Sequence, residues 1–302
     1  MVEPQAMQCH IKPLGRERAN VLQEISEFSS LAGVAALAGG LLEAFRAKRP
    51  LVHNITNLVA MDVSANVLLA IGASPAMVHA GEEVEAFAGL ADALVVNVGT
   101  LSRPFADSML LAAREMNRLG KPWVLDPVGA GAMPFRNGVL GQLLALNPTV
   151  IRGNASEILA LGHIAGLTGD NAAPRGVDSQ HATAAAEAMA RQLARHTGGT
   201  VAATGAVDFI TDGAREVRLG NGDAMMARVT ALGCALSAVC AGFAAVTPDR
   251  FAGATAAIAV YGVAGEMAAA VSNGPGSFRV AFLDQLFHIS GNNIASSLKV
   301  AA

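Results

Sequence analysis

Residues 229–238 combine the start of a helix with a cysteine, an arrangement that could hold a phosphate group. Gly233 forms a short turn, and a long run of small and apolar residues typical of a helix follows from Cys234. The first backbone N–H groups of a helix lack partners within the helix, and the helix dipole favours anions there. Such a helix end can bind an anion, and Cys234 lies where that anion would bind. Most glycine-to-helix junctions are only turns, so this interpretation needs support from other segments.

Asp126 offers a carboxylate at the end of a short strand pattern, and it begins the glycine-rich sequence DPVGAGAMP. Gly129 and Gly131 would let the backbone approach a ligand closely, while the carboxylate faces a metal ion or a substrate hydroxyl. The alternative is an Asp-Pro turn that leads into a loop. This motif alone supports both interpretations equally.

Residues 152–157 (RGNASE) begin a helix directly after a strand pattern. Asn154 is a favourable N-cap, and Glu157 follows three residues later, which is the spacing of a capping box. The structural interpretation is therefore strong. In the functional interpretation, Glu157 supplies a carboxylate close to Mg²⁺ while Arg152 reaches a nucleotide phosphate.

Three further groups could line a small-molecule site. Thr204, followed by a glycine, ends a strand pattern and offers a hydroxyl next to free backbone. The polar cluster HNITN at residues 53–57 ends in Asn57 and could equally hydrogen-bond its own turns. Met77 has a soft apolar side chain suited to a flat heteroaromatic ring, although a single methionine is more often core filler.

The elements that position these residues alternate between short apolar strands and longer helices rich in alanine and leucine. This alternation predicts an α/β protein with a mostly parallel central sheet flanked by helices. Strand patterns cover residues 94–98, 123–125, 150–151, 200–203 and 208–211. Helix patterns cover residues 66–71, 104–119, 155–161, 181–195, 234–246 and 251–271.

Ligands of open parallel sheets bind beyond the carboxyl ends of the strands. Here polar or glycine-rich groups follow five strands in succession, at residues 97–100, 126–131, 152–154, 204–205 and 212–213. Each group alone is explained as a turn. Because all five are expected at one edge of the sheet, together they predict a binding site there.

Composition limits the classes of function. Of the 302 residues, 52% are hydrophobic and only 4% aromatic, so the core must be built from small aliphatic residues and glycine. The formal net charge is −3, so the chain lacks the excess of positive charge that is typical of nucleic-acid binding proteins. The three cysteines, at positions 9, 234 and 240, argue against a disulfide framework and favour a reducing, cytoplasmic compartment.

A single folded domain at residues 31–302 is the simplest interpretation, because the alternation resumes after the polar loop 166–178 without a change in composition. Residues 1–30 are expected to form a loosely ordered leader; the first apolar stretch lies too far in for a signal peptide. Residues 229–248 and 252–267 are apolar, but small residues dominate both and the second contains Glu266. Two buried helices explain them better than membrane spans do.

In these residues the chain resembles the hydroxyethylthiazole kinases, a family of the ribokinase-like superfamily. The matching pieces occur in the family's order and read PLVHNITNLVAMDVSANVLLAIGASPAMV, LVVNVGTL, WVLDPVGAGAMPFR, IRGNASEI, ATGAVDFITDG, GCALSAV and GPGSF. The combination of HNITN with GASPAM and IRGNASEI is the most specific. The resemblance implies a ribokinase-like fold and transfer of the ATP γ-phosphoryl group to the hydroxyl of 4-methyl-5-(2-hydroxyethyl)thiazole, in thiamine biosynthesis.

The resemblance also implies roles for individual residues. On the acceptor side it places a thiazole contact at Met77, with Asn57, Gly99 and Ala231 as further substrate-binding positions. On the nucleotide side it implies ATP contacts at Arg152 and Thr204, joined by Asn154, and an acidic pair around Mg²⁺ at Asp126 and Glu157. Gly233 and Cys234 are expected at the transfer step. Members of the family are typically trimers with active sites near subunit contacts, so a homotrimer is expected.

One position departs from the family pattern. Members usually carry Gly-x-Gly-Cys at the start of the anion-binding helix, whereas this chain has Ala231 at the first glycine and Leu232 after it. If the position needs a positive φ, alanine there costs on the order of 1 kcal/mol. A Cβ also hinders close approach of the backbone to a ligand. The departure is expected to lower affinity or rate and to leave the fold intact.

The expected mechanism is alignment and charge neutralisation, with little covalent chemistry. The N–H groups of Gly233, Cys234 and Ala235 hold the migrating phosphoryl group, and Mg²⁺ and Arg152 offset the remaining charge. We expect the helix N-terminus to lower the thiol pKa of Cys234, so that it accepts a proton or orients the alcohol. Two alternatives stay open: a related kinase for another small alcohol, such as a pyrimidine or sugar, and a thiazole-binding protein that no longer supports transfer.

Overall fold

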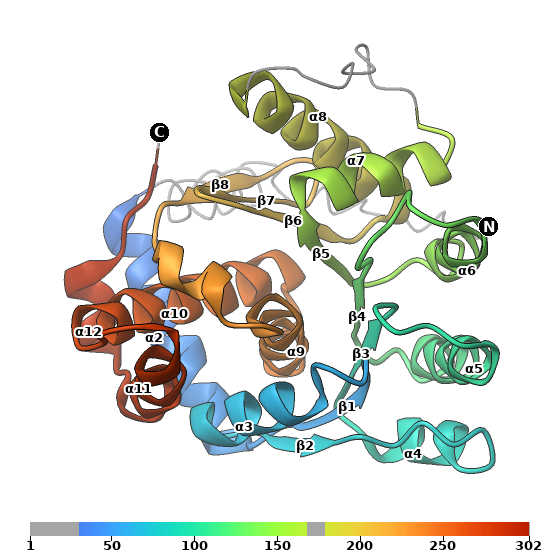
Figure 1. Ribbon diagram of the computed structural model, residues 1–302, viewed down its shortest axis with the longest axis horizontal. Coiled ribbons are helices and arrows are strands. Elements are labelled where there is room, and N and C mark those ends of the chain that lie inside the picture. Colours follow the sequence, from blue (N-terminus) through green and yellow to red (C-terminus); the bar gives the residue numbers. More distant parts are fainter. Residues whose placement is uncertain (1–29, 168–178, 302) are drawn as a thin grey trace, which may run out of the picture.

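An eight-stranded sheet runs through the middle of the molecule in the order β2-β1-β3-β4-β5-β6-β7-β8 (Figure 1). This computed structural model describes residues 30–167 and 179–301, so almost all of the expected leader, Cys9 and most of the loop 166–178 lie outside the described residues. The strands are β1 (Leu51–Ile55), β2 (Ser74–Ala76), β3 (Ala93–Asn97), β4 (Trp123–Asp126), β5 (Val150–Asn154), β6 (Thr200–Thr204), β7 (Asp208–Thr211) and β8 (Glu216–Leu219). All neighbouring pairs from β2 to β6 are parallel, and β7 and β8 are antiparallel to their neighbours.

Helices cover both faces of the sheet (Figure 1). One face carries α4 (Val84–Leu90), α5 (Arg103–Arg118), α6 (Pro134–Leu144), α7 (Ala155–Ile164) and α8 (Ser179–Thr197). The other face carries α2 (Leu31–Lys48), α3 (Met61–Ile71), the 3-10 helix η1 (Ala224–Arg228), α9 (Leu232–Ala244), α10 (Arg250–Ala270), α11 (Pro275–His288) and α12 (Gly291–Ser297). Each face has its own buried apolar cluster. The prediction of a mostly parallel sheet flanked by helices is confirmed.

Several elements did not show in the hydropathy pattern. The cluster HNITN is largely the buried strand β1: His53 packs edge-on against Phe87 and bonds the carbonyl of Val78 through Nε2 at 2.7 Å. Strand β2 is only three residues long, and β8 carries charged residues at alternate positions. Helices α4, α6, α11 and α12 were also missed, and α4 and α12 have only seven residues each.

The two long apolar segments near the C-terminal end are core helices, as predicted. Within the described part of the chain, α10 is long and apolar enough to cross a membrane, but 89% of its most apolar window is buried. It packs against α2, α9 and α11. Small residues permit this close packing: a Cβ on Gly242 of α9 would lie 2.5 Å from the Phe45 ring.

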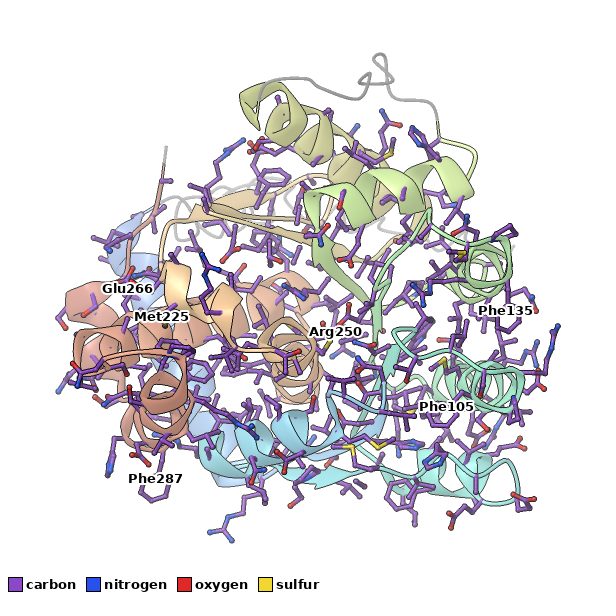
Figure 2. All side chains as sticks on the ribbon, in the orientation of Figure 1. Phe105, Phe135, Met225, Arg250, Glu266 and Phe287 are labelled. Carbon is purple, nitrogen blue, oxygen red and sulfur yellow. The ribbon has the colours of Figure 1, made fainter. Side chains whose placement is uncertain are left out.

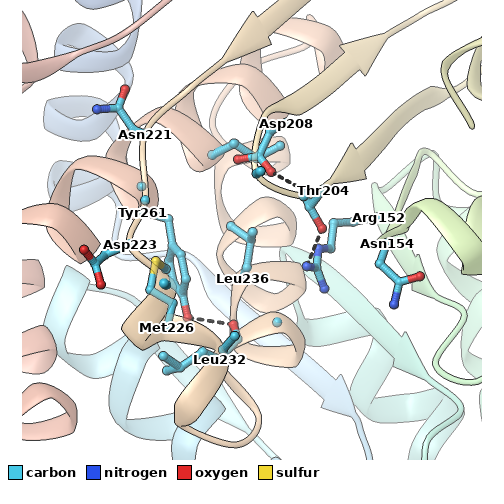
Figure 3. A pocket seen from close by; sticks show the side chains of 18 residues that line it. Arg152, Asn154, Thr204, Asp208, Asn221, Asp223, Met226, Leu232, Leu236 and Tyr261 are labelled. Atoms are coloured by element: carbon cyan, nitrogen blue, oxygen red, sulfur yellow. Dashed lines mark hydrogen bonds between the residues drawn. The ribbon is translucent and has the colours of Figure 1, made fainter. Parts of the chain in front are cut away.

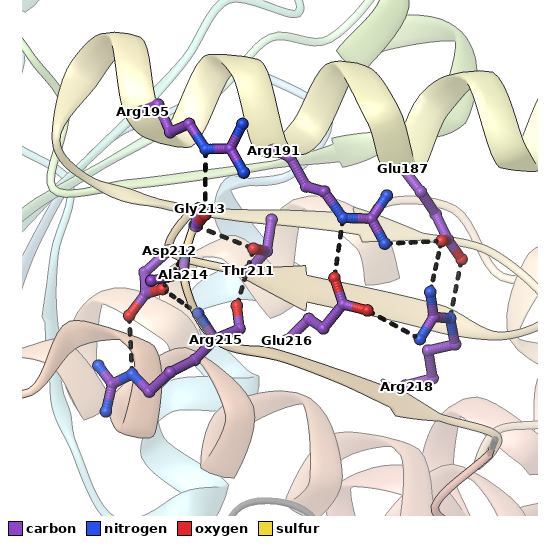
Figure 4. Close-up of polar contacts among 10 residues, drawn as sticks. All are labelled: Glu187, Arg191, Arg195, Thr211, Asp212, Gly213, Ala214, Arg215, Glu216 and Arg218. Atoms are coloured by element: carbon purple, nitrogen blue, oxygen red, sulfur yellow. Dashed lines mark hydrogen bonds and ion pairs between the residues drawn. The ribbon is translucent and has the colours of Figure 1, made fainter. Parts of the chain in front are cut away.

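One of the five polar groups expected at the carboxyl edge lies at the opposite edge. Strand β7 runs antiparallel to β6, so the residues after it, Asp212 and Gly213, emerge at the other end of the sheet. There the Asp212 carboxylate accepts from the Arg215 guanidinium at 2.8 Å, and the Gly213 carbonyl accepts from Arg195 at 3.1 Å (Figure 4). This prediction was wrong, and the group is a turn stabilised by an ion pair and by hydrogen bonds.

Candidate functional site

Helix α9 begins at a residue in the left-handed backbone region. Ala231 is its N-cap residue, with φ 67° and ψ 1°, and no side chain caps this helix end. The helix itself starts at Leu232, two residues earlier than predicted. No described residue accepts a hydrogen bond from the N–H groups of Gly233 or Cys234, whereas the Ala235 N–H donates to the Ala231 carbonyl at 2.9 Å. The expected cradle of amides is therefore present without Ala235.

Arg152 places a positive charge directly against this helix start. Its Nη2 donates to the Thr204 hydroxyl at 2.5 Å, and a Cβ on Gly233 would lie only 2.9 Å from its Nη1. The buried Nε atom has no hydrogen-bond partner in the described part of the chain. No carboxylate of the described residues forms an ion pair with this guanidinium. Free amides, the helix dipole and an unpaired cation thus converge at one point, which suits a phosphate group.

Asp126 lies beneath the same helix start and is fully buried. Its Oδ2 accepts from the Asn97 side chain at 2.7 Å and from the Ser237 hydroxyl, on the second turn of α9, at 2.8 Å. Its Oδ1 is buried and has no hydrogen-bond partner among residues 30–167 and 179–301. Burial raises the pKa of Asp126 to about 6, and the positive charge of Arg152 opposes that rise. The free oxygen is the feature that points to a cation or to an ordered water.

A chain of amide groups connects Asp126 to Cys234. The Asn57 Nδ2 group donates to Asn97 Oδ1 at 2.9 Å and to the Cys234 sulfur at 3.3 Å. A side chain at Gly99 would clash with Asn57, because a Cβ there would lie 2.8 Å from the Asn57 Cβ. Burial, followed by the negative charge of Asp126, raises the pKa of the Cys234 thiol. The expectation of a lowered pKa at the helix N-terminus was wrong.

Glu157 and Asn154 form the capping box that their spacing predicts. The Asn154 Oδ1 accepts from the Glu157 N–H at 2.9 Å, and Glu157 Oε2 accepts from the Asn154 N–H at 2.9 Å. The other oxygen, Oε1, accepts from the Gly129 N–H at 3.0 Å, which joins α7 to the loop after β4. The negative charge of Glu157 nevertheless contributes to the raised pKa of Asp126. Among the described residues, no group of three or more His, Cys, Asp or Glu side chains could hold a metal ion.

A cavity of about 560 Å³ opens beside the start of α9 (Figure 3). Its lining includes four of the predicted site residues, namely Arg152, Asn154, Thr204 and Gly233. The opposite wall is formed by the segment 221–227 and by α10 through Ile258, Tyr261 and Gly262. The volume and the mixed lining are typical of a site for a small molecule.

The other predicted residues do not line this cavity. They are Met77, Asn57, Gly99, Ala231, Cys234, Asp126 and Glu157. Met77 follows β2, so it lies at the same sheet edge as the residues that follow β1 and β3. The predicted residues therefore fall into two groups, one that lines the cavity and one that does not.

Four residues of the site had no assigned role in the sequence. Asn97 ends strand β3, a position that could have identified it, and Ser237 lies one turn after Gly233 on an otherwise apolar helix. Asp208 begins β7 and lines the cavity, and its Oδ1 accepts from the Gly205 N–H at 2.9 Å. Burial raises the pKa of Asp208 to about 6. Asn221 lines the opposite wall, and nothing in its sequence neighbourhood marks it.

Comparison with known proteins agrees with this geometry. The model of the hydroxyethylthiazole kinase family matches residues 42–292. The chain belongs to the hydroxyethylthiazole kinase family. A curated hydroxyethylthiazole kinase from Rhizobium leguminosarum bv. trifolii is 51% identical over 265 residues, which are 87% of this chain and 97% of that relative.

Solved structures extend the family assignment to the fold. The hydroxyethylthiazole kinase structure from Pyrococcus horikoshii has a TM-score of 0.79 at 41% identity, covering 87% of this chain and 98% of that one. A ribokinase-like superfamily protein from Enterococcus faecalis has a TM-score of 0.57 at 14% identity, covering 83% of this chain and 89% of that one. This second likeness concerns the fold alone, and it agrees with the ribokinase-like architecture that the family resemblance implied.

Proposed function

We propose that this protein transfers the γ-phosphoryl group of ATP to the hydroxyl of 4-methyl-5-(2-hydroxyethyl)thiazole, a step of thiamine biosynthesis. Family membership supports this activity. The observation that carries it concerns the N–H groups of Gly233 and Cys234, which have no hydrogen-bond acceptor among the described residues. They lie next to the Arg152 guanidinium, which forms no ion pair with a described carboxylate. Phosphoryl transfer needs this kind of fixed, positively charged alignment more than it needs covalent chemistry.

ATP would occupy the cavity, with its phosphates toward Arg152, Thr204 and Asn154. Their position at the α9 end of the cavity supports this orientation, since the remaining lining is mostly apolar and suits a base. Arg152 can offer several N–H donors in a planar fork, and the free Nε is one of them. As the γ-phosphoryl group moves, the amides of Gly233 and Cys234 would stabilise the charge on its oxygens.

The thiazole alcohol would bind on the other side of the α9 start, among Met77, Asn57, Gly99 and Ala231. The hydrogen bond from Asn57 to the Cys234 sulfur supports a fixed position for that side chain. With its pKa raised, Cys234 is a neutral thiol at pH 7, so its role would be to orient the substrate hydroxyl. Gly233 would allow the phosphoryl group to lie close to the backbone between the two substrates.

Asp126 fits a role in holding Mg²⁺, because one of its oxygens is buried and has no partner. Mg²⁺ in phosphoryl-transfer sites is held by one or two carboxylates together with substrate phosphates and water, so a cluster of protein ligands is not required. Bound there, the ion would neutralise charge on the phosphates. Glu157 would add negative charge at that end of the site, although both its oxygens already accept backbone N–H groups.

A homotrimer with active sites near subunit contacts, in the cytoplasm, completes the proposal. Exposed apolar side chains support a contact surface on α3 and α11, two helices that pack together. Leu69 of α3 is 59% exposed, and Val280 and Phe287 of α11 are 63% and 65% exposed. Figure 2 shows Phe287 at the outer edge of the molecule. Leu58 and Val59 are exposed directly after Asn57, which places apolar surface next to the acceptor side of the site. Light scattering after gel filtration measures the mass.

The activity is tested by ADP release from purified protein with Mg-ATP and a panel of alcohols. We expect turnover with the hydroxyethylthiazole and much less with hydroxymethylpyrimidine, pyridoxal or a sugar. A preference for one of the other alcohols would move the assignment to a related kinase. Binding of the thiazole without ADP release would show a binding protein instead.

A further inference from the structure

One acidic side chain interrupts the apolar helix α10 near its end. Glu266 is 21% exposed, and its Oε1 accepts two hydrogen bonds. One comes from the Gly222 N–H at 3.1 Å and the other from the Lys299 ammonium group at 2.8 Å. Figure 2 shows Glu266 on the same side of the molecule as Met225. A carboxylate of a core helix thus joins a loop before η1 to the C-terminal segment, residues 297–301.

Backbone groups of the C-terminal segment form hydrogen bonds with the same loop. The side chain of Asn221, only 6% exposed, donates to the Ser297 carbonyl at 2.8 Å and accepts from the Lys299 N–H at 2.7 Å. The Gly220 N–H donates to the Lys299 carbonyl at 2.9 Å. Val300 forms an antiparallel bridge with Leu219, the last residue of β8. Both ends of the Asn221 amide are therefore used to hold the C-terminal segment.

The segment 221–227, which begins at these contacts, forms one wall of the proposed nucleotide cavity (Figure 3). It follows β8 outside the eight-stranded sheet, and the only helix or strand that the structure describes in it belongs to η1, so its position depends on the contacts around it. On α10, a Cβ at Gly262 would lie 2.9 Å from the Asn221 Cβ, and a Cβ at Gly265 would lie 2.5 Å from the Met226 sulfur. The wall is thus set by close packing on α10 and by the C-terminal segment behind it.

We propose that the C-terminal segment 297–301 and Glu266 are positioning elements of the nucleotide site. They do not line the cavity, and they act by holding Asn221 and Gly222 in place. The proposal rests on the proposed function, because it takes ATP as the occupant of this cavity. The family model ends at residue 292, so the C-terminal segment lies beyond the part of the chain that it matches.

A pair of substitutions at one position tests the proposal. Glu266→Ala removes the acceptor for the Gly222 N–H, whereas Glu266→Gln keeps an oxygen acceptor and loses only the charge. We expect Glu266→Ala to raise the Kd for Mg–AMP-PNP, measured by calorimetry, and the KM for ATP by about fivefold to tenfold. Glu266→Gln should stay within about twofold of the natural protein. The KM for the thiazole alcohol and kcat at saturating ATP should not change.

A protein lacking residues 299–302 provides a second route to the same result, and Ser296→Ala is its control. Ser296 is exposed and bonds only its own turn among the described residues, so that variant should match the natural protein. We expect the shortened protein to show the same rise in nucleotide Kd as Glu266→Ala. Circular dichroism reports whether it folds; if it does not, the pair at position 266 decides.

Two results would overturn the inference. In the first, Glu266→Ala and the shortened protein bind Mg–AMP-PNP as tightly as the natural protein. In the second, both KM values rise while kcat and the melting temperature fall, which would indicate that Glu266 and the C-terminal segment stabilise the fold in general. Failure of the natural protein itself to bind Mg–AMP-PNP would instead refute the proposed function, so the two failures are distinguishable.

Discussion

Replacing Ala231 by glycine isolates the cost of the backbone conformation at the start of α9. At φ 67° and ψ 1°, Ala231 lies in the left-handed region. For a residue with a Cβ this region costs about 1–2 kcal/mol. Glycine removes that cost but gives up about 0.5–1 kcal/mol through the greater freedom of the unfolded chain. The net expectation for Ala231→Gly is a stabilisation of about 0.5 kcal/mol.

The matched control is Ala36→Gly, at an exposed position inside α2. The same chemical change in a helix interior costs about 1 kcal/mol. The two variants should therefore differ in unfolding free energy by about 1.5 kcal/mol and, in a domain of this size, by roughly 3–6 °C in melting temperature. Urea denaturation and thermal unfolding measure both quantities. If Ala231→Gly loses as much stability as Ala36→Gly, the reasoning from backbone strain is refuted.

The same substitution should affect catalysis on the acceptor side. Ala231 does not line the nucleotide cavity, so the KM for ATP should stay unchanged. Removal of the methyl group lets the backbone approach the alcohol more closely, and we expect kcat/KM for the thiazole to rise by about threefold to tenfold. Steady-state kinetics with each substrate varied in turn separates the two sides. A change confined to the KM for ATP would contradict the placement of Ala231.

Three further predictions concern Gly233, Cys234 and Asp208. Gly233→Ala should raise the KM for ATP by about tenfold while the protein stays folded. The new Cβ would lie 2.9 Å from Arg152 Nη1 and would displace the guanidinium. An unchanged KM for ATP would contradict this. Cys234→Ser should keep most of kcat, and Cys234→Ala should lower kcat by less than about tenfold, because the proposed role of the neutral thiol is only to orient the alcohol. A complete loss of activity in Cys234→Ala would instead indicate that the thiol acts as a base. Asp208→Asn should be more stable than the natural protein at pH 7 and equal to it near pH 4, as thermal unfolding across this range would show.

The sign of the Asp208 prediction follows from proton binding. Burial raises the folded pKa from 3.8 to about 6, so between pH 4 and 6 the folded protein holds a proton that the unfolded chain releases. Stability from this group is full below pH 4 and falls as the pH rises through 6. The loss reaches at most about 3 kcal/mol, and Asn avoids it while still accepting from the Gly205 N–H. Equal pH dependence in Asp208→Asn and the natural protein would exclude this account.

The sequence predicted the carboxyl edge of the sheet because parallel strands bring their ends to one side. Asp126, Arg152 and Thr204 each lie at or near the end of a strand, and the structure gathers all three around the start of α9. The capping box of Asn154 and Glu157 was equally predictable, since its two members lie three residues apart and satisfy each other locally. Short-range patterns of this kind need no knowledge of the rest of the chain.

The error at Asp212 had a signal in the sequence. Strand β6 ends at Thr204 and β7 begins at Asp208, so three residues connect them. A parallel connection needs a crossover of a dozen or more residues, whereas an antiparallel one can be a short turn. The length of the connection therefore reverses β7 and moves Asp208, in place of Asp212, to the edge where the site lies.

The pKa of Cys234 and the wall at Asn221 could not be predicted in the same way, because both depend on partners far away in the chain. Asp126, whose charge raises the Cys234 pKa, is 108 positions before it, and Lys299 is 78 positions after Asn221. Local context favoured the opposite result for the thiol, since a helix N-terminus alone stabilises a thiolate. Burial next to a carboxylate outweighs that effect here. A residue's charge state at such a site therefore follows from which strand ends the topology brings beneath the helix.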